Sequence, residues 1–239
     1  MQLPFFFEEI FPPSDQFFLS ESSSRHIVQV LRMNEGEMIQ LTNGNGYLLT
    51  AEIVSSHKKK TEVKILERIL TSANQPKISI AISFIKNAGR FEWFLEKSAE
   101  IGVSQIIPLI CNRTEKFHFR NERMKSILIS AILQSRQVWL PELAEPVSVM
   151  KLINNMSYDQ KFIAHCFNEE KIELKDAPFK PFSSKIILIG PEGDFTIEEV
   201  EAAIEKGFSP VSLGETRLRT ETAGLVAAVL LKNGKTIKK

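Results

Sequence analysis

The sequence predicts an α/β protein in which a small β-rich domain precedes a larger domain of alternating strands and helices. Short strands with tight turns fill the first part of the chain, and a polar segment ending in proline follows at 71–76. Apolar strands alternate with amphipathic helices from residue 77 onward. This alternation is typical of a mainly parallel sheet covered by helices. We therefore expect two domains, at residues 1–72 and 73–239.

The composition excludes several classes of protein. Of the 239 residues, 43% are hydrophobic and 25% are charged, and glycine and proline number 11 each. These values exclude a collagen-like, low-complexity or wholly disordered chain. The 30 Lys and Arg residues are balanced by 29 Asp and Glu residues. We therefore expect no globally basic surface, whereas a local basic face is compatible with this balance.

The cysteine content and the hydropathy pattern indicate the compartment. The two cysteines, Cys111 and Cys166, are too few for a disulfide framework. The sequence has neither a signal-peptide-like apolar region nor an apolar run long enough to span a membrane. We expect a cytoplasmic protein with no membrane partner.

The β-rich domain is expected to contain a short helix at 24–33, whose apolar positions Ile27, Val30 and Leu31 have helical spacing. The segment Asn43-Gly44-Asn45-Gly46 supplies residues that adopt positive φ, and it predicts a hairpin. The lysine-rich segment 57–60 fits a solvated loop. Short strands with tight turns favour a small β-barrel, and these strands are expected at 38–42, 47–55 and 61–66.

The larger domain is expected to alternate between strands and helices up to its last helix. Phe91, Phe94 and Leu95 lie on one face of the first expected helix and should point inward. A Thr196-Ile197-Glu198-Glu199 capping box opens a later helix that Gly207 closes. Strands are expected at 78–84, 106–107, 162–166, 186–189 and 211–213, and the other helices at 90–101, 121–137 and 222–232.

The sequence lacks the familiar signatures of nucleotide and metal sites. It has no G-x-x-x-x-G-K-[ST] loop and no G-x-S-x-G elbow. Gly44-Asn45-Gly46 does not complete a G-x-G-x-x-G motif, so the hairpin interpretation is favoured there. His165 with Cys166, and His118 near Cys111, lack the spacing of zinc ligands. We expect no metal.

Two glycine-bearing loops each connect an expected strand to an expected helix. The first is Ile189–Phe195 and the second is Leu213–Ala223. Both follow the carboxyl ends of strands, where open α/β sheets bind ligands, and glycine allows close backbone approach there. Either loop alone fits an ordinary turn with a threonine helix cap. Two such loops in one domain, the second with Arg217, Arg219 and Glu221, favour a ligand site.

The motifs in these loops resemble those of a known family. Gly190-Pro191-Glu192-Gly193, followed by Leu213-Gly214 and Leu218-Arg219-Thr220-Glu221-Thr222-Ala223, resembles the bacterial 16S ribosomal RNA uridine-N3 methyltransferase family of the SPOUT superfamily. Val30–Met33 and Lys97–Val103 add to the resemblance, which covers nearly the whole chain. Two positions depart from the pattern: Asp194 stands where many members have a second glycine, and Leu133 stands where a glutamate is common.

The resemblance implies a fold, a reaction and partners. The fold would be a PUA-like, RNA-binding β-barrel followed by a SPOUT α/β domain with a C-terminal trefoil knot, which sequence periodicity does not predict. The reaction would be S-adenosylmethionine-dependent methylation of N3 of a uridine in 16S ribosomal RNA, by a homodimer acting on the assembled small subunit. The residues implied in cofactor binding are His165, Ile189, Gly190, Glu192, Gly193, Leu213, Gly214, Leu218, Thr220 and Thr222.

The implied chemistry assigns roles to two charged residues of the second loop. Uridine N3 must lose its proton before it is a good nucleophile, and the anion spreads charge over N3, O2 and O4. The guanidinium of Arg219 would stabilise this anion. Glu221 would accept the proton, orient Arg219 or interact with the helix N-terminus.

A basic and aromatic segment at 111–125 suits RNA binding. Its cations exceed its carboxylates, and Phe117, His118 and Phe119 lie among them. A solvated loop over buried phenylalanines is the other interpretation, and for Lys58–Lys60 the solvated loop is favoured. The residues expected to contact RNA are Arg32, Lys86, Arg90, Arg113 and Arg120.

Two other functions are compatible with the same motifs. A SPOUT enzyme that methylates another RNA position, such as a ribose 2′-oxygen, shares the fold and the cofactor. A noncatalytic RNA-binding relative would also keep the fold. The presence of Gly190, Gly193, Gly214 and Arg219 argues against the noncatalytic relative.

Overall fold

The computed structural model describes residues 2–73, 76–115 and 118–234. The chain forms two compact units: Met1–Ala73 with Ile129–Leu140, and Asn74–Leu128 with Pro141–Lys239. Helix α3 (Asn121–Gln134) passes from the second unit into the first. The expected domain boundary at 71–76 includes Asn74 and Gln75, which lie outside the described residues.

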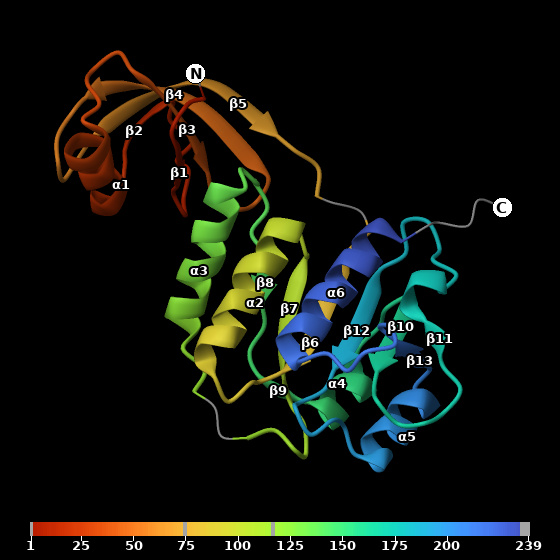
Figure 1. Cartoon of the computed structure of the whole chain (residues 1–239). Helices are drawn as coiled ribbons and strands as arrows, with labels where there is room; N and C mark the ends of the chain where they lie inside the picture. The colour runs from red at the N-terminus through yellow and green to blue at the C-terminus, as the bar shows by residue number, and fades with distance from the viewer. Residues whose placement is uncertain (1, 74–75, 116–117, 235–239) are drawn as a thin grey trace. The chain divides into compact units, whose positions relative to one another are not determined.

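The first unit contains a mixed five-stranded sheet (Figure 1). Its strands, in spatial order, are β1 (Phe5–Phe7), β3 (Met38–Thr42), β4 (Tyr47–Ser55), β5 (Glu62–Leu70) and β2 (Gln16–Phe18). β1 and β3 are parallel, and the other pairs are antiparallel. The expected strands 38–42 and 47–55 are confirmed, whereas the third strand extends four residues beyond its expected end at 66.

The expected helix at 24–33 is wrong in its type and in its buried face. Helix α1 spans Glu21–Arg25, and a π-helix follows at His26–Leu31. The i→i+5 hydrogen bonds of a π-helix change the angular spacing of side chains from that of an α-helix. Ile27 is fully buried, but Val30 and Leu31 are 65% and 42% exposed.

The predicted hairpin at Asn43–Gly46 is confirmed, and it packs against a distant segment. Gly44 and Gly46 have φ of 72° and 88°, which glycine adopts without strain. A Cβ atom at Gly46 would lie 2.5 Å from Cζ2 of Trp139. Leu140 donates its backbone N–H to the Gly44 carbonyl at 2.8 Å. The helix expected over 121–137 therefore ends at Gln134, because the following residues pair with this hairpin.

The second unit contains an eight-stranded sheet whose strand pairs are all parallel, as the sequence predicts. The spatial order is β11-β13-β10-β12-β6-β7-β8, and β9 also pairs with β7. The strands are β6 (Ile78–Ser83), β7 (Gln105–Ile110), β8 (Glu142–Leu143), β9 (Val147–Ser148), β10 (Gln160–Ala164), β11 (Ile172–Glu173), β12 (Lys185–Ile189) and β13 (Ser209–Ser212).

Helices cover both faces of this sheet. Figure 1 shows α2 and α6 side by side on one face, and the side chains of α4 and α5 share a core with Ile186 and Leu188 of β12 on the other. The helices are α2 (Ala88–Ile101), α4 (Val149–Asn155), α5 (Ile197–Glu205), α6 (Thr220–Asn233) and a 3₁₀ turn at Leu174–Asp176. Ile187 and Ile189 alternate with these core residues, so they point toward the α2 and α6 face.

Packing and capping explain the placement of α2, α5 and α6. Phe91, Phe94 and Leu95 are buried as predicted. A Cβ atom at Gly224 of α6 would lie 2.7 Å from Cε2 of Phe94, so glycine allows the two helices to approach closely. The capping box of α5 is confirmed: Thr196 accepts from the Glu199 backbone, and Glu199 accepts from the Thr196 backbone.

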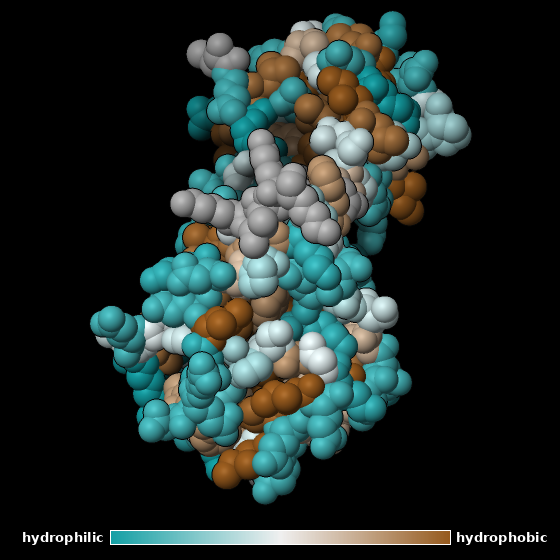
Figure 2. All heavy atoms as spheres, turned by 90° about the vertical axis from the view of Figure 1, so that its right-hand side faces the viewer, coloured by the Kyte–Doolittle hydropathy of each residue, from teal (hydrophilic) through white to brown (hydrophobic). Residues whose placement is uncertain are grey.

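One face of the second unit is mainly polar. Figure 2 shows this face, where hydrophilic side chains predominate and hydrophobic side chains are exposed between them. Isolated exposed apolar side chains are normal on a protein surface. Among the described residues, no helix combines the length and the hydrophobicity that crossing a membrane requires.

Candidate active site

A cavity of about 740 Å³ lies where β10, β12 and β13 end. Its wall consists of residues from three loops, within 164–171, 189–194 and 211–223, together with Arg90 of α2. These three strands are neighbours in the parallel sheet, so their carboxyl ends, and the loops that follow, meet at one edge. The volume lies in the range of roughly 300–1,000 Å³ that is common for small-molecule sites.

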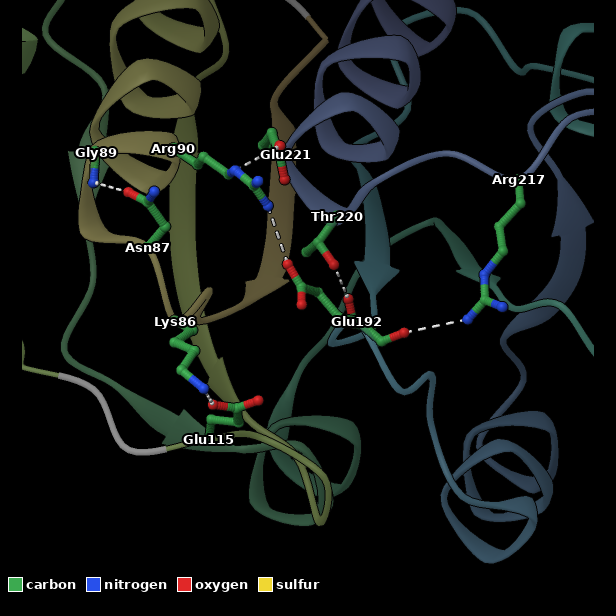
Figure 3. Close-up of polar contacts among 10 residues, drawn as sticks. Lys86, Asn87, Gly89, Arg90, Glu115, Glu192, Arg217, Thr220 and Glu221 are labelled. Carbon is green, nitrogen blue, oxygen red and sulfur yellow. Dashed lines mark hydrogen bonds and ion pairs between the residues drawn. The ribbon is translucent and has the colours of Figure 1, made fainter.

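Two hydrogen bonds connect the loop after β13 to the loop after β12 (Figure 3). Thr220 donates its hydroxyl to the Gly190 carbonyl at 3.1 Å, and this contact is buried. Arg217 donates from Nη2 to the Glu192 carbonyl at 3.2 Å. The N-terminus of α6 is therefore held against the end of β12.

Asp194 connects the loop after β12 to the loop after β10. Its carboxylate accepts from the Cys166 backbone N–H at 2.7 Å and from the Phe195 backbone N–H at 2.8 Å. Asp194 has a φ of 65°, a region that aspartate tolerates better than most residues. The departure from the family pattern at this position therefore keeps the turn that a glycine would make and adds a hydrogen-bonding side chain.

Gly214 gives the cavity an open stretch of backbone. Its φ is 134°, and no atom lies within 4 Å of the place where a Cβ would stand. Such a φ is rare for residues with a side chain. The conformation requires glycine here, and it leaves the backbone accessible to a ligand.

His165 is a buried polar side chain that lines the cavity. It is 6% exposed, and neither ring nitrogen has a hydrogen-bond partner among the described residues. Burial, and secondarily the charge of Lys171, lower the pKa of His165 below its ordinary value. The ring is therefore neutral near pH 7 and offers one donor and one acceptor. Buried polar atoms usually have hydrogen-bond partners. The two unpartnered ring nitrogens of His165 therefore indicate that a ligand binds beside this ring.

Lys171 holds the loop that carries His165. It donates from Nζ to the His165 carbonyl at 2.8 Å and to the Phe167 carbonyl at 2.6 Å. It also lines the cavity. Sequence reasoning missed this residue because no motif distinguishes it from any other loop lysine.

Arg90 stands between two carboxylates at the cavity wall (Figure 3). Its Nη1 donates to Oε1 of Glu192 at 3.2 Å, and its Nε lies 3.7 Å from Oε1 of Glu221. Glu221 is only 6% exposed, and its Oε2 has no partner among the described residues. Arg90 lines the cavity, whereas Glu221 does not.

Arg219 is placed differently from Arg90. It is the residue before the first turn of α6, its side chain is exposed, and it lines the cavity. Its carbonyl accepts from the Ala223 backbone N–H at 2.7 Å, but its side chain has no hydrogen bond and no ion pair among the described residues. Its guanidinium is therefore available to a ligand.

The comparison with known proteins gives the family. The RNA methyltransferase domain family matches residues 72–232, and the RNA methyltransferase PUA domain family matches residues 19–66. The ribosomal RNA small subunit methyltransferase E of Buchnera aphidicola is 30% identical over 223 residues, which cover 90% of this chain and 87% of the relative. The chain belongs to the ribosomal RNA small subunit methyltransferase E family.

Solved structures of similar proteins agree with this membership. A probable rRNA methyltransferase from Porphyromonas gingivalis has a TM-score of 0.90 and 35% identity, with 96% of this chain and 97% of that chain covered. The ribosomal RNA small subunit methyltransferase E of Neisseria gonorrhoeae, bound to S-adenosyl methionine, has a TM-score of 0.85 and 30% identity, with 97% of each chain covered.

Most of the cofactor-binding residues that the sequence predicts lie together at the cavity. Of the residues predicted to bind the cofactor or to act in catalysis, three do not line it: Gly193, Glu221 and Thr222. Cys166, Lys171, Asp194 and Arg217 line it without having been predicted to bind the cofactor. The predicted residues that line it are His165, Ile189, Gly190, Glu192, Leu213, Gly214, Leu218, Arg219 and Thr220.

The residues expected to contact RNA do not form one free basic face. Lys86 pairs with Glu115 at 3.1 Å. Arg113 donates from Nη1 to the carbonyls of Gly193 and Phe195, at 2.7 and 3.3 Å, so it fastens the loop after β12. Arg90 is held by the two carboxylates described above.

Two predicted RNA-binding residues remain exposed. Arg120 lies just before α3 in the second unit, and Arg32 lies in the first unit with a φ of 55°. In the aromatic segment, His118 is exposed and Phe119 packs edge-on against Phe84, while Lys116 and Phe117 lie outside the described residues. Lys58–Lys60 form the solvated loop that the sequence favours.

Both cysteines are free, and burial raises the pKa of the Cys111 thiol to about 12. Over residues 2–73, 76–115 and 118–234, no group of three or more His, Cys, Asp and Glu side chains is arranged to hold a metal ion.

Proposed function

We propose that this chain transfers a methyl group from S-adenosylmethionine to N3 of a uridine in 16S ribosomal RNA. The observation that carries the proposal is the cavity at the ends of β10, β12 and β13, into which the unpartnered His165 ring and the open Gly214 backbone are built. Relatives with this fold contain S-adenosylmethionine: the Neisseria enzyme and a Legionella pneumophila methyltransferase with 31% identity and a TM-score of 0.85.

The residues of the cavity fit the cofactor. His165 has a free donor and a free acceptor for polar atoms of the ligand, and Gly190 and Gly214 allow the backbone to approach it closely. Ile189, Leu213 and Leu218 provide apolar surface for the adenine. When it is bound, S-adenosylmethionine supplies a methyl group on a cationic sulfur. Glu192, Gly193, Thr220 and Thr222 complete the set of residues that we propose to hold it.

The chain's own residues then act on the uridine. The base leaves its stack to reach the cavity, since N3 lies on the pairing edge. N3 loses its proton to solvent water, and Arg219, whose guanidinium has no partner among the described residues, stabilises the anion that forms.

We further propose the quaternary and topological features that the family implies. The C-terminal loops form a trefoil knot, and the first unit is a PUA-like barrel that contributes to RNA binding through Arg32, with Arg120 contributing from the second unit. The protein is a homodimer that acts on the assembled small subunit in the cytoplasm. Support for the dimer comes from α2 and α6, which expose Trp93 and Val229 by 41% and 40%.

Complementation tests the proposal. The chain is expressed in a bacterial strain whose own family member has been deleted, and 16S RNA is digested to nucleosides and analysed by mass spectrometry. We expect N3-methyluridine to return with the wild-type chain and not with Gly214→Val. Methylation of a ribose would instead identify a SPOUT enzyme of different specificity. Absence of any new methyl group, with the protein present and folded, would favour a noncatalytic RNA-binding protein.

A further inference from the structure

Glu221 is the carboxylate that the sequence offers as a proton acceptor, but the structure places it away from the cavity. It is 6% exposed and is absent from the cavity wall. Its ion pair among the described residues is with Arg90, at 3.7 Å between Oε1 and Nε. A buried carboxylate is stabilised chiefly by its cation. The two side chains are therefore coupled to each other.

Arg90 is held in one orientation from two sides. Glu221 approaches Nε and Glu192 accepts from Nη1, so the guanidinium is fixed between the first turn of α6 and the loop after β12 (Figure 3). Nη2 has no partner among the described residues. Since the side chain of Arg90 is 35% exposed and lines the cavity, this edge is accessible to a ligand there.

We propose that Arg90 contacts the target uracil in the cavity, and that Glu221 is a positioning residue that acts through Arg90. The inference rests on the proposed function. The free edge of the guanidinium donates to a carbonyl oxygen of the base, and that bond strengthens as N3 loses its proton and negative charge moves onto the carbonyl oxygens. Arg90 and Arg219 then act on the same base, Arg90 from a position held by two carboxylates and Arg219 from an exposed side chain.

The buried position of Glu221 distinguishes this role from proton transfer. A general base must come within hydrogen-bond reach of the proton that it accepts. Glu221 does not line the cavity, and its carboxylate faces Arg90 (Figure 3). A phosphate is a poorer partner for Arg90 than the base is, because Glu192 and Glu221 surround the guanidinium with two negative charges against its one.

A double-mutant cycle on the full-length protein tests the inference. Arg90→Lys keeps a cation beside Glu221. The ammonium group of lysine cannot pair with both carboxylates and also donate from a free edge to the base. We measure kcat and KM for small-subunit RNA, and the Kd for S-adenosylmethionine by calorimetry, for the wild type, R90K, E221Q and R90K/E221Q. The control is E92Q. Glu92 lies on α2, as Arg90 does, and its carboxylate pairs with Arg123 of α3.

We expect R90K to lower kcat by ~10²-fold, as the loss of one fixed donor does in other enzymes, and E221Q to lower it by less. The R90K/E221Q variant should match R90K, because residues that act as a unit are not additive. Cofactor Kd should stay unchanged in all variants, and E92Q should match the wild type. Folding is checked by circular dichroism. R90M/E221Q, which leaves no buried carboxylate without a cation, replaces R90K and its double variant if R90K does not fold.

The opposite pattern overturns the inference. If E221Q costs as much in the R90K background as in the wild type, or more than R90K itself, Glu221 acts on the substrate directly. If R90K weakens cofactor binding as much as turnover, Arg90 belongs to the cofactor site. A folded wild type that methylates no RNA would contradict the proposed function, and it is distinguished from these outcomes because the cycle then has no starting activity.

Discussion

The hydroxyl of Thr220 donates to the carbonyl of Gly190, and this one bond joins the first turn of α6 to the end of β12 inside the protein. Both residues are buried, and both line the cavity. The loops that form the cavity therefore share one rigid wall. Rigid placement of this kind keeps a small-molecule site formed before the ligand arrives.

Thr220→Val keeps the shape of the side chain and removes the hydroxyl. The Gly190 carbonyl is then buried without this donor, which costs about 1–3 kcal/mol of folding stability. We also expect weaker binding of S-adenosylmethionine, because among the described residues only the hydrogen bond from Arg217 to the Glu192 carbonyl then joins the two loops. Urea unfolding and calorimetry measure the two effects. Thr220→Ser restores the hydroxyl and should restore both; failure of this rescue would show that the hydrogen bond is not responsible.

Gly214→Val should abolish cofactor binding. A valine at φ of 134° is strained, and its branched side chain would occupy the open space beside the backbone. Gly36 provides a matched control in the first unit, since it has a φ of 84° and equally no atom within 4 Å of a Cβ position. Calorimetry should show normal cofactor affinity for Gly36→Val. Equal loss in both variants would mean that backbone strain, and not the position in the cavity, causes the effect.

Arg219→Ala should lower turnover by about 10²-fold, comparable to the loss of one charge stabiliser in other enzymes. Cofactor affinity should fall by much less, since Arg219 is proposed to act on the uridine. Single-turnover kinetics with saturating RNA, together with calorimetry, separate the two quantities. Equal losses in turnover and affinity would make Arg219 a cofactor-binding residue.

The buried His165 predicts a dependence of stability on pH. Burial holds its pKa below the ordinary value of 6.5, so the unfolded chain takes up a proton that the folded chain does not. Stability should therefore fall as the pH drops through 6.5, and this loss should end once the pH is below the pKa of the folded state. Urea unfolding across this range should show a smaller loss for His165→Asn than for the wild type. His26→Asn, at an exposed position, is the control; an identical response of both variants would remove His165 as the cause.

The sequence predicted the parallel sheet, its strands β6, β7, β10, β12 and β13, and the loops of the cavity, because these features depend on local patterns. It did not predict the short strands β8, β9 and β11 or the helix α4. Alternating apolar residues determine β3 and β4, and Thr196 with Glu199 determine the start of α5. Short-range signals of this kind do not depend on distant contacts.

Features that depend on distant contacts were not predicted. The segment after α3 leaves its helical path because Trp139 and Leu140 pack on the Gly44–Gly46 hairpin, nearly a hundred residues earlier in the chain. The π-helix at His26–Leu31 was not predicted either, because the spacing of its apolar residues is the same as that expected for an α-helix. In the site, the basic character of Arg113 predicts RNA contact but does not predict its hydrogen bond to the Gly193 carbonyl, which fastens a loop. Charge alone does not reveal which cation has a partner.

The most direct test of the proposed reaction uses the purified chain, isolated small subunits lacking the modification, and S-adenosylmethionine with a deuterated methyl group. The RNA is digested to nucleosides and analysed by mass spectrometry. We predict one deuterated N3-methyluridine per subunit with the wild type, and none with Gly214→Val. A deuterated methyl on a ribose or on another base, or no transfer by a folded protein that binds the cofactor, would contradict the assignment.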